Sequence, residues 1–96
     1  MRDPRIDPAP GDVLCSPGST AIAVVTAATD DVVTFKMRDL NQPDKTEVLT
    51  LGQWRDAAQR SVTLADKIEG FDRERAEVAA RLAKIDAALA FLRGAK

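Results

Sequence analysis

Side chains that could carry out catalysis are scarce in this chain of 96 residues. It contains no histidine and no tyrosine, and its single cysteine, Cys15, has no base near it in the sequence. The usual nucleophile and proton-transfer pairs are therefore absent. Carboxylates remain, but the pair Asp30-Asp31 lies between apolar runs, and Asp3 and Asp7 lie in a proline-rich segment, so neither pair makes a metal cluster. We expect a protein that is not an enzyme and that holds no cofactor and no metal.

The charge of the chain is nearly balanced. The formal net charge is −1, and neither half of the chain is strongly basic. Tight binding to nucleic acid needs several phosphates to be neutralised together, so the balance argues against this role as the main one. Nucleic-acid binding stays as an alternative, which would use Arg2, Arg5, Lys36, Arg38 and Lys45.

Cysteine use and hydropathy indicate where such a chain would work. With Cys15 as the only cysteine, no internal disulfide can form, which suits a reducing compartment. Residues 1–12 hold prolines and charges where a signal peptide would be apolar, and the apolar run 21–25 is too short to span a bilayer. We expect a cytoplasmic protein with no membrane partner.

Nine positions in the last third of the chain are separated by alternating steps of four and three residues, and eight of them are apolar. A helix with this repeat has one narrow seam, which is stable in water only when a helix or groove covers it. The seam would be about 44 Å long, whereas a domain of about 60 residues has a radius of gyration near 10 Å. We therefore predict a homo-oligomer, with a dimer favoured. Two alternatives are that the seam packs onto the chain's own domain and that a different protein covers it. The seam consists of Leu64, Ile68, Phe71, Arg75, Val78, Leu82, Ile85, Leu89 and Leu92.

The heptad register of this helix has a charge pattern. With Ile68 at position a, a parallel dimer would face Lys67 toward Asp72 and Arg81 toward Asp86 of the second copy, two pairs of opposite sign. Each exposed pair contributes only a few tenths of a kcal/mol, and alanines beside the seam leave antiparallel packing or a larger bundle open.

Arg75 interrupts the apolar seam at an a position. A buried guanidinium without a partner is unfavourable, so we expect it to meet a carboxylate such as Glu74 or to extend out of the seam into water. Gly70, which lowers helix stability relative to alanine, could mark a bend.

The first half of the chain has the pattern of β-structure. Runs rich in β-branched residues at 13–14, 21–28, 32–38 and 46–51 are bounded by turn formers, with a loop at 39–45. Within 32–38, alternation places Val33, Phe35 and Met37 on one face, which we expect to be the core.

Two short helix signals follow the strands. Thr50 and Gln53 form a capping-box pattern, which predicts a short helix that packs Trp54 against the sheet. Thr63 with Asp66 is a second capping pattern, and the apolar phase changes before it, so we favour a break there. The expected fold is α+β, a small SH3-like bent sheet or partial barrel followed by a long coiled-coil helix. Its parts are a flexible proline-rich arm at 1–11, a β-domain with a short helix at 12–60 and a heptad helix at 61–94.

The N-terminal part of the chain also carries a resemblance. The run DPRIDPAPGDVL at 3–14, followed by a hairpin and then TLGQWR at 50–55, resembles small uncharacterised proteins encoded by bacteriophages and prophages. The Pro-Gly-Asp-Val segment within it is also similar to SH3-like and KOW-type barrels. This resemblance implies an accessory protein of the host cytoplasm or a component of virion assembly.

These expectations converge on a binding protein. The leading hypothesis is a non-enzymatic oligomer that displays a small β-domain and acts by steric binding to a host protein, such as a defence factor. A nucleic-acid-binding module and a virion-assembly subunit are the alternatives. The acidic residues in or near the β-domain loops could meet a basic groove of the protein target; they are Asp30, Asp31, Asp39, Asp44 and Glu47.

Overall fold

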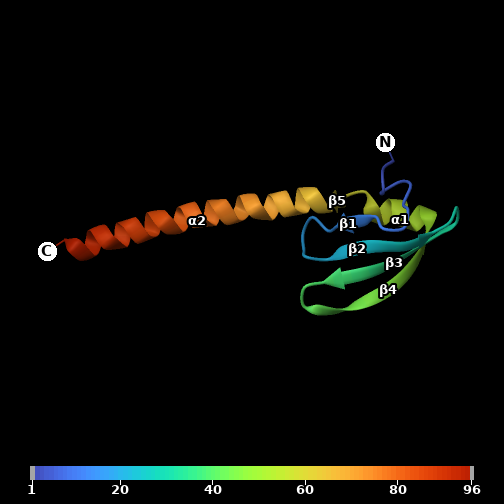
Figure 1. Ribbon diagram of the computed structural model, residues 1–96, viewed down its shortest axis with the longest axis horizontal. Helices are drawn as coiled ribbons and strands as arrows, with labels where there is room; N and C mark the ends of the chain where they lie inside the picture. The colour runs from blue at the N-terminus through green and yellow to red at the C-terminus, as the bar shows by residue number, and fades with distance from the viewer. Residues whose placement is uncertain (1, 96) are drawn as a thin grey trace.

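The computed structural model describes residues 2–95 and shows an extended α+β molecule. A small β-domain lies at one end, and a single long helix leaves it toward the C-terminus (Figure 1). The molecule measures 73 × 31 × 19 Å, and its Cα radius of gyration is 20.0 Å, whereas a compact chain of this length would have about 12 to 13 Å. Most of the long helix therefore lies away from the domain.

The domain is built on one antiparallel sheet of five strands. These are β1 (Val13–Cys15), β2 (Ile22–Ala28), β3 (Val32–Asp39), β4 (Gln42–Thr50) and β5 (Val62–Thr63), in the order β4-β3-β2-β1-β5. Because β4 and β5 are the two edges, the sheet is open. The predicted α+β class, a small β-sheet followed by a long helix, is confirmed.

Strand register explains which face of the sheet is the core. Val25 pairs with Phe35, and a bulge after Val25 brings Ala28 opposite Val33 on the same face. Val25, Val33 and Phe35 are buried, and Met37 packs against them. The assignment of the alternate residues of β3 to the core is confirmed.

Two strand boundaries differ from the sequence-based expectation. The predicted loop at 39–45 is a tight turn at 40–41, and β4 already begins at Gln42. Pro43 fits within β4 because an edge strand has backbone N–H groups that need no partner in the sheet. The two-residue strand β5, which pairs with β1, was not expected.

Helix α1 (Leu51–Ala58) covers the core face of the sheet. The Thr50 hydroxyl accepts a hydrogen bond from the Gln53 N–H, and the Gln53 side chain accepts from the Thr50 N–H, so the capping box is confirmed. Trp54 is buried against Phe35, with ring centroids 5.2 Å apart and an interplanar angle of 62°. The prediction that Trp54 anchors this helix is confirmed.

The proline-rich segment before β1 lies on the domain, although the sequence predicts a flexible arm. Trp54 Nε1 donates to the Pro4 carbonyl at 3.0 Å, and Arg55 Nε donates to the Ile6 carbonyl at 2.8 Å. Arg2 binds the Asp12 carboxylate through both terminal nitrogens. The contacts of Trp54 and Arg55 end on backbone carbonyls, which a residue pattern does not reveal.

Helix α2 (Leu64–Gly94) follows β5 directly and has 31 residues, which makes it about 46 Å long. Its N-cap is Thr63, whose hydroxyl accepts from the Asp66 N–H at 3.1 Å. The second capping pattern and the break between the two helices are therefore confirmed.

An exposed helical seam as candidate interaction surface

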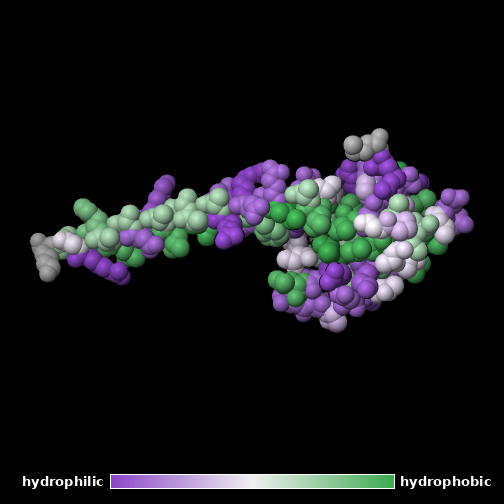
Figure 2. Space-filling view, in the orientation of Figure 1, coloured by the Kyte–Doolittle hydropathy of each residue, from purple (hydrophilic) through white to green (hydrophobic). Residues whose placement is uncertain are grey.

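The nine seam positions of α2 lie in water along its whole length. Apolar side chains run along the helix outside the domain (Figure 2), and the eight apolar seam residues are 39% to 63% exposed. Leu64 and Ile68, next to the domain, are 42% and 52% exposed, close to 51% for Val78 and 56% for Leu82 farther out. The alternative in which the seam packs onto its own domain is therefore wrong.

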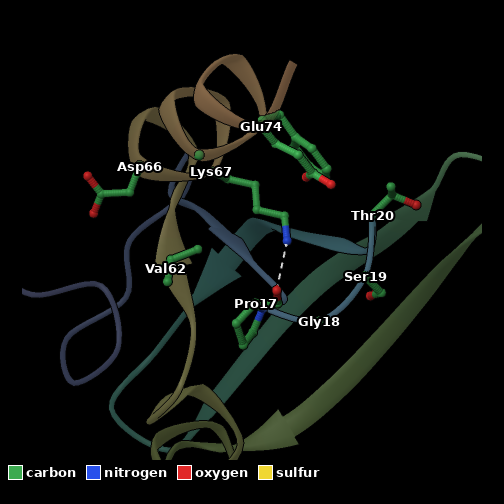
Figure 3. Close-up of a pocket in the computed structure, with 10 residues that line it drawn as sticks. Pro17, Gly18, Ser19, Thr20, Val62, Asp66, Lys67 and Glu74 are labelled. Carbon is green, nitrogen blue, oxygen red and sulfur yellow. Dashed lines mark hydrogen bonds between the residues drawn. The ribbon is translucent and has the colours of Figure 1, made fainter. Parts of the chain in front are cut away.

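One cation of α2 joins the helix to the loop between β1 and β2. Lys67 Nζ donates to the carbonyl oxygens of Ser16 at 2.6 Å and Pro17 at 3.1 Å, and it lies 5.1 Å from the centre of the Phe71 ring. In Figure 3 the Lys67 side chain points from α2 toward the loop between β1 and β2. An ammonium group carries three N–H donors, so two of them are used within the chain. The Lys67 ammonium group therefore has at most one N–H left for the predicted pairing with Asp72 of a second copy.

A corner cavity of about 530 Å³ lies beside this contact, between the β1–β2 loop and the first turns of α2. Its walls are the loop residues of Figure 3 and, on the helix, Asp66, Gly70, Phe71 and Glu74. The domain thus sits beside the first turns of the seam, on the side of Lys67 and Glu74, and the seam residue Phe71 borders the cavity.

The second predicted charge pair has both members available. Arg81 and Asp86 are exposed, and neither makes an ion pair within residues 2–95. Arg75 and Glu74 are likewise exposed and without an ion pair in this range. The pair that does form on α2 joins Arg73 to Glu69 at 3.2 Å, away from the seam.

Phe91 is an apolar surface residue that the heptad pattern does not include. It is 76% exposed and lies one residue before the last seam position. Because Phe91 lies outside the steps of four and three residues, the sequence gives no indication that it pairs with another helix. The anchor role of Lys67 had no sequence signal either, because its partners lie about 50 positions away.

The acidic residues proposed to meet a protein partner do not form one surface. Asp30 and Asp31 lie in the turn between β2 and β3, whereas Asp39 ends β3 at its other end, about 25 Å away along an eight-residue strand. Glu47 lies opposite Phe35 on the α1 face of the sheet and pairs with Lys45 at 3.4 Å.

Two of these acids already have partners at the turn between β3 and β4. Asp39 accepts from the Thr20 hydroxyl, and Asp44 pairs with Arg38 at 3.5 Å. Asp39 and Asp44 lie near this turn, whereas Asp30 and Asp31 share the turn between β2 and β3 at the other end of the strands.

The basic residues of the nucleic-acid alternative are dispersed in the same way. Lys36 and Arg38 lie on the sheet face opposite α1, whereas Lys45 lies opposite Met37 on the α1 face. Arg2 and Arg5, in the N-terminal segment, pair with Asp12 and Asp3. The five side chains form no continuous positive face.

Cys15 is closed to solvent at 1% exposure. Burial raises the pKa of its thiol above the ordinary value, and the Lys67 ammonium partly opposes this rise. A protonated, inaccessible thiol is a poor nucleophile. In the described part of the chain, no three side chains of the types that bind metals come together as a possible metal site.

Comparisons with known proteins do not help to interpret these surfaces. Comparisons with protein-family models, with curated proteins and with solved structures found no match to the chain. The resemblance to phage proteins therefore stays a prediction. Within residues 2–95, no helix is both long and apolar enough to cross a membrane.

Proposed function

We propose that this protein is a non-enzymatic binding protein that self-associates through α2 and presents its β-domain to a protein partner. The observation that supports it is the exposed seam, whose apolar residues are 39% to 63% exposed from Leu64 to Leu92. Contiguous apolar patches of this extent on a soluble chain mark interaction sites. A second copy satisfies the 3.5-residue repeat over its whole length.

Self-association has a clear use for so small a domain. Linking two copies raises avidity for a repeated target by 10² to 10⁴ when the geometry allows both to bind. Each β-domain would then act by steric occupancy. The resemblance to phage proteins supports a host protein as the target, including a defence factor.

Sedimentation equilibrium over a wide concentration range tests the self-association. We expect a defined oligomer for the wild type and dissociation for the double variant Leu82→Asp, Leu89→Asp, because charges in the seam cannot be desolvated without partners. The matched control is Ala80→Asp, Ala87→Asp, which adds the same charges on the opposite side of α2 and should leave the oligomer intact. A wild-type monomer at all concentrations would overturn the proposal.

Co-purification tests the partner class. Tagged wild-type protein should retain a host protein that the dissociated variant retains less well. Recovery of virion proteins in its place would support the assembly alternative.

A further inference from the structure

We infer that α2 pairs in parallel and in register with α2 of a second copy, so that both β-domains lie side by side at one end of the assembly. This inference rests on the proposed self-association and specifies its geometry.

The position of the domain permits this arrangement. A parallel partner must lie along the seam beside the domain, starting at Leu64, and the first seam residues are as exposed there as those beyond the domain. The domain occupies the flank marked by Lys67 and Glu74. In register, all nine seam positions meet their own counterparts, and Leu92, at 63% exposure, is covered by Leu92 of the second copy.

Charges beside the seam favour the same orientation. In a parallel pair, Arg81 faces Asp86 of the second copy, twice by symmetry. Lys67, which already bonds the domain, faces Asp72 of the second copy, and the remaining flanking contacts place a charge against alanine. An antiparallel pair whose seams overlap from Ile68 to Leu92 would place Arg81 against Arg81 and Asp72 against Asp86 of the second copy. Like charges at these sites are unfavourable.

Sliding an antiparallel pair by one heptad replaces the like charges with a contact of Arg81 to Glu74, or of Arg93 to Asp72, but it loses apolar contact. A shift one way leaves Leu92 of each copy uncovered, and a shift the other way uncovers Leu64, Ile68 and Phe71. Burial of one leucine is worth more than an exposed ion pair. The parallel register is therefore the arrangement that keeps both the apolar and the ionic contacts.

Arg75 can be accommodated in this register by contact with Glu74 of the second copy. At an a position, its long side chain can extend past the seam toward the g residue of the second copy, which is Glu74. Both groups lack an ion pair within the described residues. Two such contacts would separate the facing guanidinium groups.

The orientation decides how the domains are presented. A parallel pair holds two β-domains next to each other, whereas an antiparallel pair would hold them at opposite ends of a helix about 46 Å long. The parallel form suits a target with two binding sites side by side.

Disulfide trapping tests the orientation. In a Cys15→Ala background, a single Leu92→Cys variant should form a disulfide-linked dimer under mild oxidation, and Leu64→Cys should do the same. Mixed and re-equilibrated, the two variants should form no heterodisulfide. An antiparallel pair holds the two copies of each cysteine at opposite ends, so neither variant would form a disulfide with itself, and that result would overturn the inference.

Sedimentation of the same proteins in reduced form distinguishes a failure of self-association from a failure of the parallel orientation. A reduced monomer would overturn self-association itself, whereas a reduced dimer in which Leu92→Cys forms no disulfide would overturn only the parallel orientation.

Charge exchange provides a second test with Cys15 in place. Arg81→Asp should raise the dimer dissociation constant about three- to tenfold, and adding Asp86→Arg should restore it, because the exchanged pair again has opposite signs. Lys84→Asp makes the same charge change off the seam and should alter the constant by less than about twofold. Failure of the double exchange to restore dimerisation would contradict the parallel register.

Discussion

At the residue scale, a few polar contacts hold the chain to its small domain. The buried core has few large side chains, chiefly Val25, Val33, Phe35 and Trp54. Contacts at its margin then matter more, because a core this small leaves little stability in reserve. Asp12 is one such contact, since it accepts from Arg2 and also from the Ala9 N–H at 2.8 Å.

Neutralising Asp12 should weaken the fold. The Arg2 guanidinium and the Ala9 N–H hold the pKa of this carboxyl below its ordinary value, so its ionised form stabilises the folded state. This stabilisation is present above about pH 4 and is lost as the pH falls through the lowered pKa. Asp12→Asn should reduce the free energy of unfolding by about 1 kcal/mol at pH 7.

Urea titration followed by Trp54 fluorescence, at one protein concentration, measures this change. The difference between wild type and variant should shrink below about pH 4. Asp56→Asn, which alters an exposed carboxylate of α1, serves as the control and should change stability by less than about 0.5 kcal/mol. An equal loss in both variants would indicate a general charge effect.

At the element scale, α2 has a capped N-terminus but a glycine that lowers its stability. Thr63 caps its N-terminus, but Gly70 lies within its second turn. Of the glycines in the described residues, Gly11 has a positive φ of 93°, whereas Gly70 is helical. A Cβ built at Gly70 has no atom within 4 Å.

Gly70→Ala should therefore stabilise α2 by about 1 kcal/mol, because alanine loses less backbone entropy in a helix. Thermal unfolding followed at 222 nm, at fixed protein concentration, should show a higher midpoint. Gly11→Ala is the matched comparison and should lower the midpoint, since an L-residue is strained at φ 93°. A lower midpoint for Gly70→Ala would show that a second chain approaches α2 at this glycine.

At the scale of the whole molecule, the two halves depend on different forces. The β-domain has its own core around Trp54, whereas α2 has no buried residue. Helices in water gain most of their stability from packing an apolar face. The part of α2 beyond Glu74, the last helix residue lining the corner cavity, should therefore depend on the second copy.

Thermal unfolding should occur in two phases. The first, seen as loss of helical signal at 222 nm, should shift to higher temperature as the protein concentration rises. The second, seen by Trp54 fluorescence, should shift less. Leu82→Asp, Leu89→Asp should remove the concentration dependence, and a concentration-independent first phase in the wild type would contradict this dependence on pairing.

Local patterns were sufficient for the parts of the molecule whose physics is local. The caps at Thr50 and Thr63, the core face of β3 and the spacing of the seam depend on residues within a few positions of one another, so the sequence alone determined them. The seam also showed, by its length, that the domain could not cover it.

Contacts between distant segments were decided only by the tertiary structure. Lys67 reaches carbonyls about 50 positions away, and the two residues of β5 form a strand only because β1 offers a free edge. The five acids were near one another in sequence, but the strands carry them to opposite ends and faces of the sheet. Chain folding sets such distances through backbone contacts, and these leave no pattern of side chains along the sequence.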